Sequence, residues 1–159
     1  MSRFTATLIA ITVLTLSTAA RTRTTQSQLR TTSIPVERIA ADTTADSIAG
    51  VSPDDVTLRG YSKRASDSRE SFFITNNTTH RITGVRLQMR YSALDGSMLH
   101  ERVATVDADL KSGESRLVTV STFDVQRLFY YYAGPKPRKR ATPFKVSYRL
   151  LGYSIPVGR

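Results

Sequence analysis

The segment from residue 129 to residue 140 gathers the side chains best suited to bind a ligand. Three consecutive tyrosines end an aromatic run, and four cations follow in the next eight residues. The aromatic and basic residues are Tyr130, Tyr131, Tyr132, Lys136, Arg138, Lys139 and Arg140. Aromatic rings beside cations can bind sugars, anionic lipids or nucleobases by stacking, cation–π contact and charge attraction. In the structural alternative, alternate aromatics enter the core while Gly134, Pro135 and Pro137 shape an exposed loop, because large aromatic side chains are usually buried.

Residues for catalysis or metal binding are few. The chain has two histidines, His80 and His100, and no cysteine, which excludes disulfides, thiolate metal sites and a cysteine nucleophile. A zinc site or a catalytic triad would need partners that converge on a histidine. His80 falls in a predicted turn and His100 at a predicted outward strand position. We therefore expect no catalytic residue, no metal, no cofactor and no enzyme activity.

Two groups of polar residues allow a second interpretation. Asn76 and Asn77 begin overlapping glycosylation acceptors, but Asn-rich stretches also form turns, which we expect here. Asp54-Asp55 and the aspartates at 107 and 109 are expected to be turn carboxylates. A calcium loop would need alternating oxygen ligands at regular spacing, which do not follow either group.

The N-terminus has the order of a secretory signal. Arg3 precedes an apolar stretch from Phe4 to Leu16, and small residues follow, which predicts cleavage after Ala19 or Ala20. The apolar stretch is shorter than the ~20 residues that span a bilayer, so we expect no membrane anchor after cleavage. This predicts a signal peptide over residues 1–20 and export to the periplasm or the extracellular space.

The next segment, residues 21–52, is predicted to be a disordered linker. Its first part is rich in Thr, Arg and Gln and has too few apolar side chains to offset the entropy of ordering. Val36, Ile39 and Ala40 could line one face of a short helix after Pro35.

Residues 53–159 are predicted to form one all-β domain, an antiparallel β-sandwich. Apolar and polar residues alternate between turn signals, most clearly from Val85 to Tyr91 and from Phe144 to Leu150. Such strands bury one face against a second sheet. The predicted strands are Val56–Tyr61, Glu70–Asn76, Ile82–Ala93, Met98–Asp107, Arg116–Thr122 and Phe144–Ile155.

A hairpin is predicted at Asp95-Gly96, and its loop length decides the pairing. A two-residue loop would place His100 opposite Tyr91, in the core. A three-residue loop with left-handed Gly96 places Leu99 opposite Tyr91 instead, and we favour it. One conflict remains, because Glu101 then lies opposite an inward residue, which a bulge would relieve.

The segment from Glu70 to Thr122 resembles the FxLYD-type family of envelope domains. The similarity rests on Phe73-Ile74, Asn76-Asn77, the strand from Val85 to Tyr91, Asp95-Gly96 and Gly113-Glu114. The layout is also similar to small uncharacterised exported proteins of Bacteroidetes. The resemblance implies an immunoglobulin-like sandwich and export to the envelope, without catalytic residues.

The net charge of +10 bears on the class of partner that the protein could bind. The cations are spread over the tail, the strands and one loop, whereas nucleic-acid domains usually concentrate them, so we do not expect nucleic acid as a partner. We expect a non-catalytic interaction module that holds an envelope protein or an anionic envelope polymer by a sheet edge or by the 129–140 segment. The alternative is a binding protein for an anionic envelope glycan or lipid.

Overall fold

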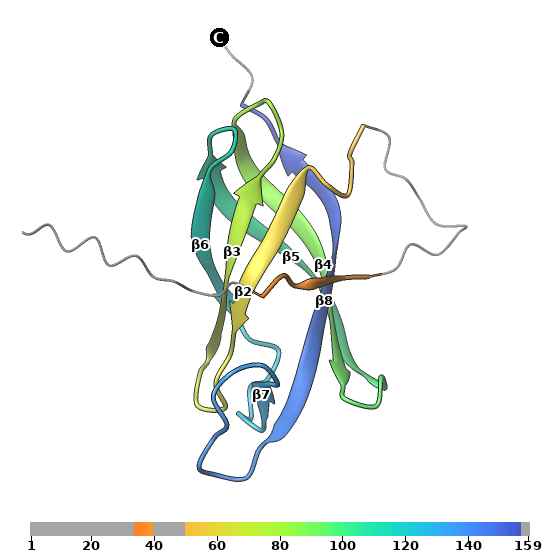
Figure 1. Ribbon diagram of the computed structural model, residues 1–159, viewed down its shortest axis with the longest axis vertical. Helices are drawn as coiled ribbons and strands as arrows, with labels where there is room; N and C mark the ends of the chain where they lie inside the picture. Colours follow the sequence, from red (N-terminus) through yellow and green to blue (C-terminus); the bar gives the residue numbers. More distant parts are fainter. Residues whose placement is uncertain (1–33, 40–49, 157–159) are drawn as a thin grey trace, which may run out of the picture.

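The protein is all-β over the residues that the computed structural model describes, 34–39 and 50–156 (Figure 1). Its strands are β1 (Glu37–Arg38), β2 (Val56–Ser62), β3 (Arg69–Asn76), β4 (Ile82–Ala93), β5 (Met98–Leu110), β6 (Ser115–Ser121), β7 (Phe129–Tyr131) and β8 (Thr142–Ser154). The six predicted strands are confirmed with small shifts at their ends. β1 and β7 were not predicted.

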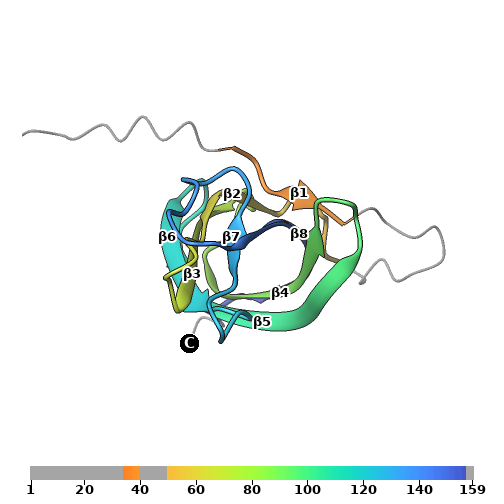
Figure 2. The ribbon, with the colours of Figure 1, turned by 90° about the horizontal axis from the view of Figure 1, so that it is seen from below.

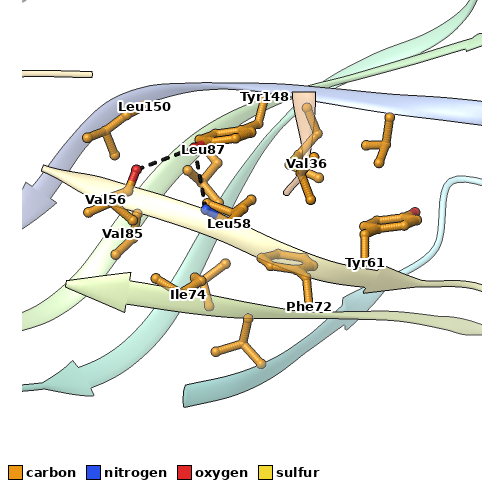
Figure 3. Close-up of a cluster of buried hydrophobic side chains, with 14 of the residues drawn as sticks. Val36, Val56, Leu58, Tyr61, Phe72, Ile74, Val85, Leu87, Tyr148 and Leu150 are labelled. Carbon is orange, nitrogen blue, oxygen red and sulfur yellow. Dashed lines mark hydrogen bonds between the residues drawn. The ribbon is translucent and has the colours of Figure 1, made fainter. Parts of the chain in front are cut away.

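Two sheets face each other as a β-sandwich (Figures 1 and 2). The smaller has the order β2-β3-β6, and the larger has the order β1-β8-β4-β5, with β7 also paired to β8. The alternation seen in the sequence places one face of each sheet in the core, as the close-up of Leu58, Phe72, Ile74 and Leu87 shows (Figure 3). Tyr148 carries a polar group into this core, and its hydroxyl lies 3.5 Å from the Val56 carbonyl oxygen.

The larger sheet is mixed, which corrects the expectation of two antiparallel sheets. β8 is antiparallel to β4 but parallel to β1 and β7. The loop from Tyr132 to Ala141 brings the chain back to the level at which β7 begins, so β8 starts beside β7 and runs the same way. β7 could not be predicted from the sequence, because a strand of three residues is too short to show an alternation of apolar and polar residues.

Residues 34–39 belong to the sandwich rather than to a linker or a helix. Pro35 bridges Arg59 of β2, and two residues later Glu37–Arg38 pairs with β8, so the segment connects the two sheets (Figure 2). Val36, between these contacts, is buried in the core. The predicted short helix is therefore wrong for these residues, because Val36 is buried from an extended backbone and not from a helix. The predicted signal peptide (1–20) and most of the predicted linker (21–33 and 40–49) lie outside the described residues.

The predicted three-residue loop of the β4–β5 hairpin is confirmed. The Ala93 amide donates to the Ser97 carbonyl oxygen at 2.8 Å, which leaves residues 94–96 as the loop. Gly96 has a φ of 91°, the left-handed backbone that glycine adopts without a Cβ clash.

The register beyond this loop is not the predicted one. Ser92 pairs with Met98, but Tyr91 pairs with His100, so Leu99 is an extra residue in β5. This bulge shifts the rest of β5 by one position and turns Glu101 to the outside, which relieves the conflict noted above. The consequence is that His100 and Arg102 lie on the inward side of the sheet.

Asn76 organises the turn after β3 and is fully buried. Its Nδ2 donates to the carbonyl oxygens of His80, Leu110 and Lys111 at 2.8, 3.1 and 3.1 Å, and its Oδ1 accepts from the amide and hydroxyl of Thr78. With its amide nitrogen occupied in this way, Asn76 acts as a turn residue in the folded chain.

Replacing Asn76 with alanine should lower the free energy of unfolding by about 2–3 kcal/mol, because several buried backbone groups lose their partner. Asn77→Ala is the matched control, since Asn77 is exposed and we expect a loss under about 1 kcal/mol. Denaturant unfolding of both variants measures the difference. Equal losses would contradict the role given to Asn76.

Candidate functional site

A cationic groove of about 820 Å³ lies at the end of the sandwich that carries β7. Three separate segments line it: the β2–β3 turn, the turn before β7, and the β7–β8 loop. Its lining contains six cations and no carboxylate: Arg64, Arg127, Lys136, Arg138, Lys139 and Arg140. All six are exposed, and over residues 34–39 and 50–156 none of them forms a side-chain ion pair. The groove therefore attracts anions without an internal counter-charge.

The three predicted tyrosines go to three different places. Tyr130 lines a smaller hollow of about 230 Å³ together with all four cations of the β7–β8 loop. Tyr131 is buried, with its ring centroid 4.9 Å from that of Tyr61. Tyr132 is half exposed, and the Lys145 Nζ lies 5.9 Å from its ring centroid. The structure thus brings one of the three tyrosines, Tyr130, to the loop cations, and places another in the core as the structural alternative required.

Arg64 and Arg127 were missed by the sequence analysis because they are far from residues 129–140 in the chain. Arg127 has a φ of 60°, in the left-handed region where a side chain costs roughly 1 kcal/mol or more. Among the described residues it is the one non-glycine with positive φ. Its backbone is held there by a turn in which the Arg127 amide donates to the Asp124 carbonyl oxygen at 3.3 Å.

A buried ion pair joins the two backbone segments that carry these arginines. Lys63 Nζ lies 2.6 Å from Asp124 Oδ2, and both side chains are almost fully buried. Lys63 also donates to the Phe129 carbonyl oxygen at 2.7 Å, while Asp124 accepts from the amides of Leu128 and Phe129 at 2.9 Å. Because Lys63 precedes Arg64 and Asp124 begins the Arg127 turn, the pair holds two walls of the groove together.

The ionisation of Asp124 follows from these contacts. Burial alone would raise the pKa of the Asp124 carboxyl, but the hydrogen bonds from Lys63 and from the Leu128 and Phe129 amides outweigh it. The pKa is thereby held below its usual range. Asp124 is therefore charged at neutral pH and pairs with Lys63 as a carboxylate.

A second buried carboxylate, Glu70, ties the two sheets together beside this turn. It accepts from the Tyr91 hydroxyl at 2.7 Å, from Arg102 at 3.2 Å and from the Phe123 amide at 3.1 Å. Burial, together with the charge of Glu70, raises the pKa of Tyr91 well above its usual value, so the hydroxyl stays protonated and donates. Two buried carboxylates therefore hold the segment that leads into β7. Glu70 binds the Phe123 amide, and Asp124, the next residue, binds the amides of Leu128 and Phe129.

Tyr61 carries a buried hydroxyl at the end of the sandwich where β7 lies. Its hydroxyl oxygen is buried without a hydrogen-bond partner among the described residues. Burial, and then the charge of Glu70, raises the pKa of Tyr61 well above its usual value. Tyr61→Phe should therefore raise the free energy of unfolding, by up to about 1 kcal/mol, because an unsatisfied buried hydroxyl is removed and the ring remains. A loss of more than 1 kcal/mol in denaturant unfolding would show that this hydroxyl has a partner.

The two histidines lie on different elements. His80 is in the predicted turn and exposed. His100 is on the inward side of β5, not the outward side, because the bulge at Leu99 shifts the register; its ring stacks 5.6 Å from that of Phe123 and stays exposed. Within the described part of the chain, no group of three or more His, Asp or Glu residues could hold a metal ion.

The four aspartates that were predicted as turn carboxylates lie in two different places, and Asp54 and Asp55 are in the predicted turn. Asp55 accepts from the Ser52 amide at 2.8 Å, and Asp54 pairs with Arg38 at 2.6 Å. The prediction is wrong for Asp107 and Asp109, which are exposed residues of strand β5 and not of a turn, because β5 continues to Leu110. Asp109 pairs with Arg81, which directly precedes β4.

Comparison of the chain with protein-family models, curated proteins and solved structures gave no match, so the resemblance to the FxLYD-type family stays a prediction. Across residues 34–39 and 50–156, no helix has the length and apolar character needed to cross a membrane.

Proposed function

We propose that this protein is a non-catalytic, immunoglobulin-like binding domain of the bacterial envelope that holds an anionic ligand in the cationic groove. The observation that carries the proposal is the lining of the groove, which has six cations from three segments and no carboxylate. A cleft lined by one sign of charge raises the local concentration of ligands of the opposite sign. Four of the six are arginines, whose planar groups bind phosphate and carboxylate in bidentate fashion.

The arrangement supports binding rather than chemistry. Lys63 and Asp124 form a buried ion pair that also makes backbone hydrogen bonds, so they shape the groove without reaching a ligand. The groove cations are exposed and can therefore contact a polymer or a surface. Export to the periplasm or beyond is part of the proposal and is supported by the N-terminal pattern alone.

A partner protein bound at a sheet edge is the second candidate. β5 is the terminal strand of the larger sheet, and Leu99 and Val103 on it are exposed apolar residues. Exposed edges can add a strand from another chain. Val103→Lys should then weaken binding of the partner and leave binding of anions unchanged.

The test compares two variants with the same change in charge. Lys136→Gln/Arg138→Gln/Arg140→Gln removes three groove cations, and Arg59→Gln/Arg86→Gln/Lys111→Gln removes three exposed cations elsewhere. With inorganic polyphosphate as the ligand, the groove variant should bind about 100-fold more weakly at low salt, at roughly 1 kcal/mol per cation. The control should lose less than about fivefold. Equal losses would mean that only net charge matters and would overturn the proposal.

A further inference from the structure

Two apolar side chains stand exposed beside the groove. Val125 is 86 % exposed and Leu128 is 50 % exposed, and they flank Arg127 in the turn before β7. Val125 is the most exposed large hydrophobic residue of the described chain. A turn at the surface has no need of apolar side chains for folding, since they bury little there.

The turn that presents these side chains is anchored by hydrogen bonds to two buried carboxylates. The Leu128 amide is bound by the buried Asp124 carboxylate, and the Phe123 amide is bound by the buried Glu70 carboxylate. Arg127 keeps a left-handed backbone between the two apolar residues. Strain of this kind, held by buried groups on either side, is typical of sites where geometry serves binding.

The combination fits one class of ligand better than a soluble polymer. A polyanion in water would contact the cations alone, and Val125 and Leu128 would contribute nothing to its binding. At a lipid surface, cations meet headgroup phosphates while apolar side chains enter the boundary with the acyl chains. Arg127 and the two apolar residues lie on one turn, and the other groove cations lie on the two neighbouring segments, so both layers could be contacted.

We propose that the anionic ligand is a membrane surface of phosphate-bearing lipids, with the groove cations on the headgroups and Val125 and Leu128 inserted at the acyl boundary. This inference rests on the proposed function, since it needs the groove to bind anions. The end of the sandwich that carries β7 then faces the membrane, and the opposite end, with the β3–β4 and β5–β6 turns, faces away from it (Figure 1).

The experiment uses the full chain and two variants that remove the same apolar groups. Val125→Ser/Leu128→Ser changes the turn, and Val103→Ser/Leu117→Ser changes one valine and one leucine that are exposed on the strands, at 51 % and 54 %. The ligands are vesicles of phosphatidylglycerol and phosphatidylcholine, vesicles of phosphatidylcholine alone, and soluble polyphosphate. Thermal unfolding checks that both variants are folded.

The inference predicts binding to the anionic vesicles and little to the neutral ones. Val125→Ser/Leu128→Ser should weaken binding to anionic vesicles about tenfold or more and leave polyphosphate binding unchanged, because only the lipid offers an apolar layer. Val103→Ser/Leu117→Ser should change neither.

Two results would overturn the inference and leave the proposed function intact. One is binding to polyphosphate without binding to anionic vesicles. The other is an unchanged vesicle affinity in Val125→Ser/Leu128→Ser while removal of the groove cations still weakens binding. The proposed function itself fails if removal of Lys136, Arg138 and Arg140 affects neither ligand more than the charge-matched control does.

Discussion

Replacing Asp124 with alanine should lower the free energy of unfolding by about 3–5 kcal/mol, because the Lys63 ammonium would be left buried without its counter-ion. The amides of Leu128 and Phe129 would lose their acceptor in the same step. Denaturant unfolding at neutral pH measures the change. A loss below about 1 kcal/mol would mean that water replaces the carboxylate and that the pair does not hold the turn.

Removing both charges should be less harmful than removing one. In Lys63→Met/Asp124→Asn the buried charge is absent and the asparagine oxygen can still accept from a backbone amide, so the double variant should be more stable than Asp124→Ala. Because the 124–129 turn carries Arg127, single loss of Asp124 should also weaken binding of polyphosphate, although Asp124 touches no ligand. A double variant less stable than the single one would contradict the proposed balance of charges.

The Asp124 pair should also give the protein a particular sensitivity to acid. The pKa of Asp124 is lowered in the folded state, whereas an unfolded aspartate has a pKa of about 3.9. The stabilisation is therefore complete above about pH 4 and is lost as the pH falls through the lower, folded-state pKa. The difference in unfolding free energy between wild type and Asp124→Asn should shrink below pH 4. A difference that stays constant down to pH 2 would contradict this.

Glu70→Ala should cause a loss of similar size, about 3–5 kcal/mol. Glu70 is fully buried, and its removal leaves the Tyr91 hydroxyl, the Phe123 amide and Arg102 without their shared acceptor. Because these partners lie on the larger sheet and on the segment that leads to β7, we expect loosening of the β7 end as well as lower stability.

Tyr91→Phe distinguishes the hydrogen bonds around Glu70 from the packing of the Tyr91 ring. It removes the hydroxyl that donates to Glu70 and accepts from Arg102, and it keeps the ring, so it should lose about 1–2 kcal/mol. Hydrogen exchange should show faster exchange of the Phe123, Leu128 and Phe129 amides in Glu70→Ala than in Tyr91→Phe. If the two variants were equally stable, Glu70 would be bound through Tyr91 alone.

The strands could be predicted from the sequence because a half-buried strand repeats every two residues. β4 was predicted with its observed ends, Ile82–Ala93, since it alternates clearly from Val85 to Tyr91 and turn signals flank both ends. The pairing of β4 with β5 could not be predicted to the residue. A single extra residue, Leu99, decides it, and a bulge has no signature in the alternation.

The interior of the β7 end could not be predicted for a different reason. Lys63, Glu70 and Asp124 are charged residues, which are rarely buried unless they are paired, and their partners are distant in the chain. Lys63 and Asp124 are 61 residues apart. A sequence pattern identifies a charge but not its partner, so Glu70 was predicted only as a strand residue and no role was predicted for Lys63 or Asp124.

The candidate site was predicted in part. The loop cations and Tyr130 do share a hollow, whereas Tyr131 is in the core. Arg64 and Arg127 complete the groove from two other segments, and no local run of charge marks them. A surface assembled from three loops is a property of the fold, and only the fold shows it.

The measurement that tests the groove most directly is the salt dependence of polyphosphate binding for the intact protein and the two charge-matched triple variants. Each cation that contacts the polyanion should add about 0.7 to the slope of log affinity against log salt concentration, by analogy with single-stranded nucleic acid. Removing Lys136, Arg138 and Arg140 should therefore reduce the slope by about 2, and removing Arg59, Arg86 and Lys111 should leave it nearly unchanged. Equal slopes in the two variants would contradict the assignment of the anion site to the groove.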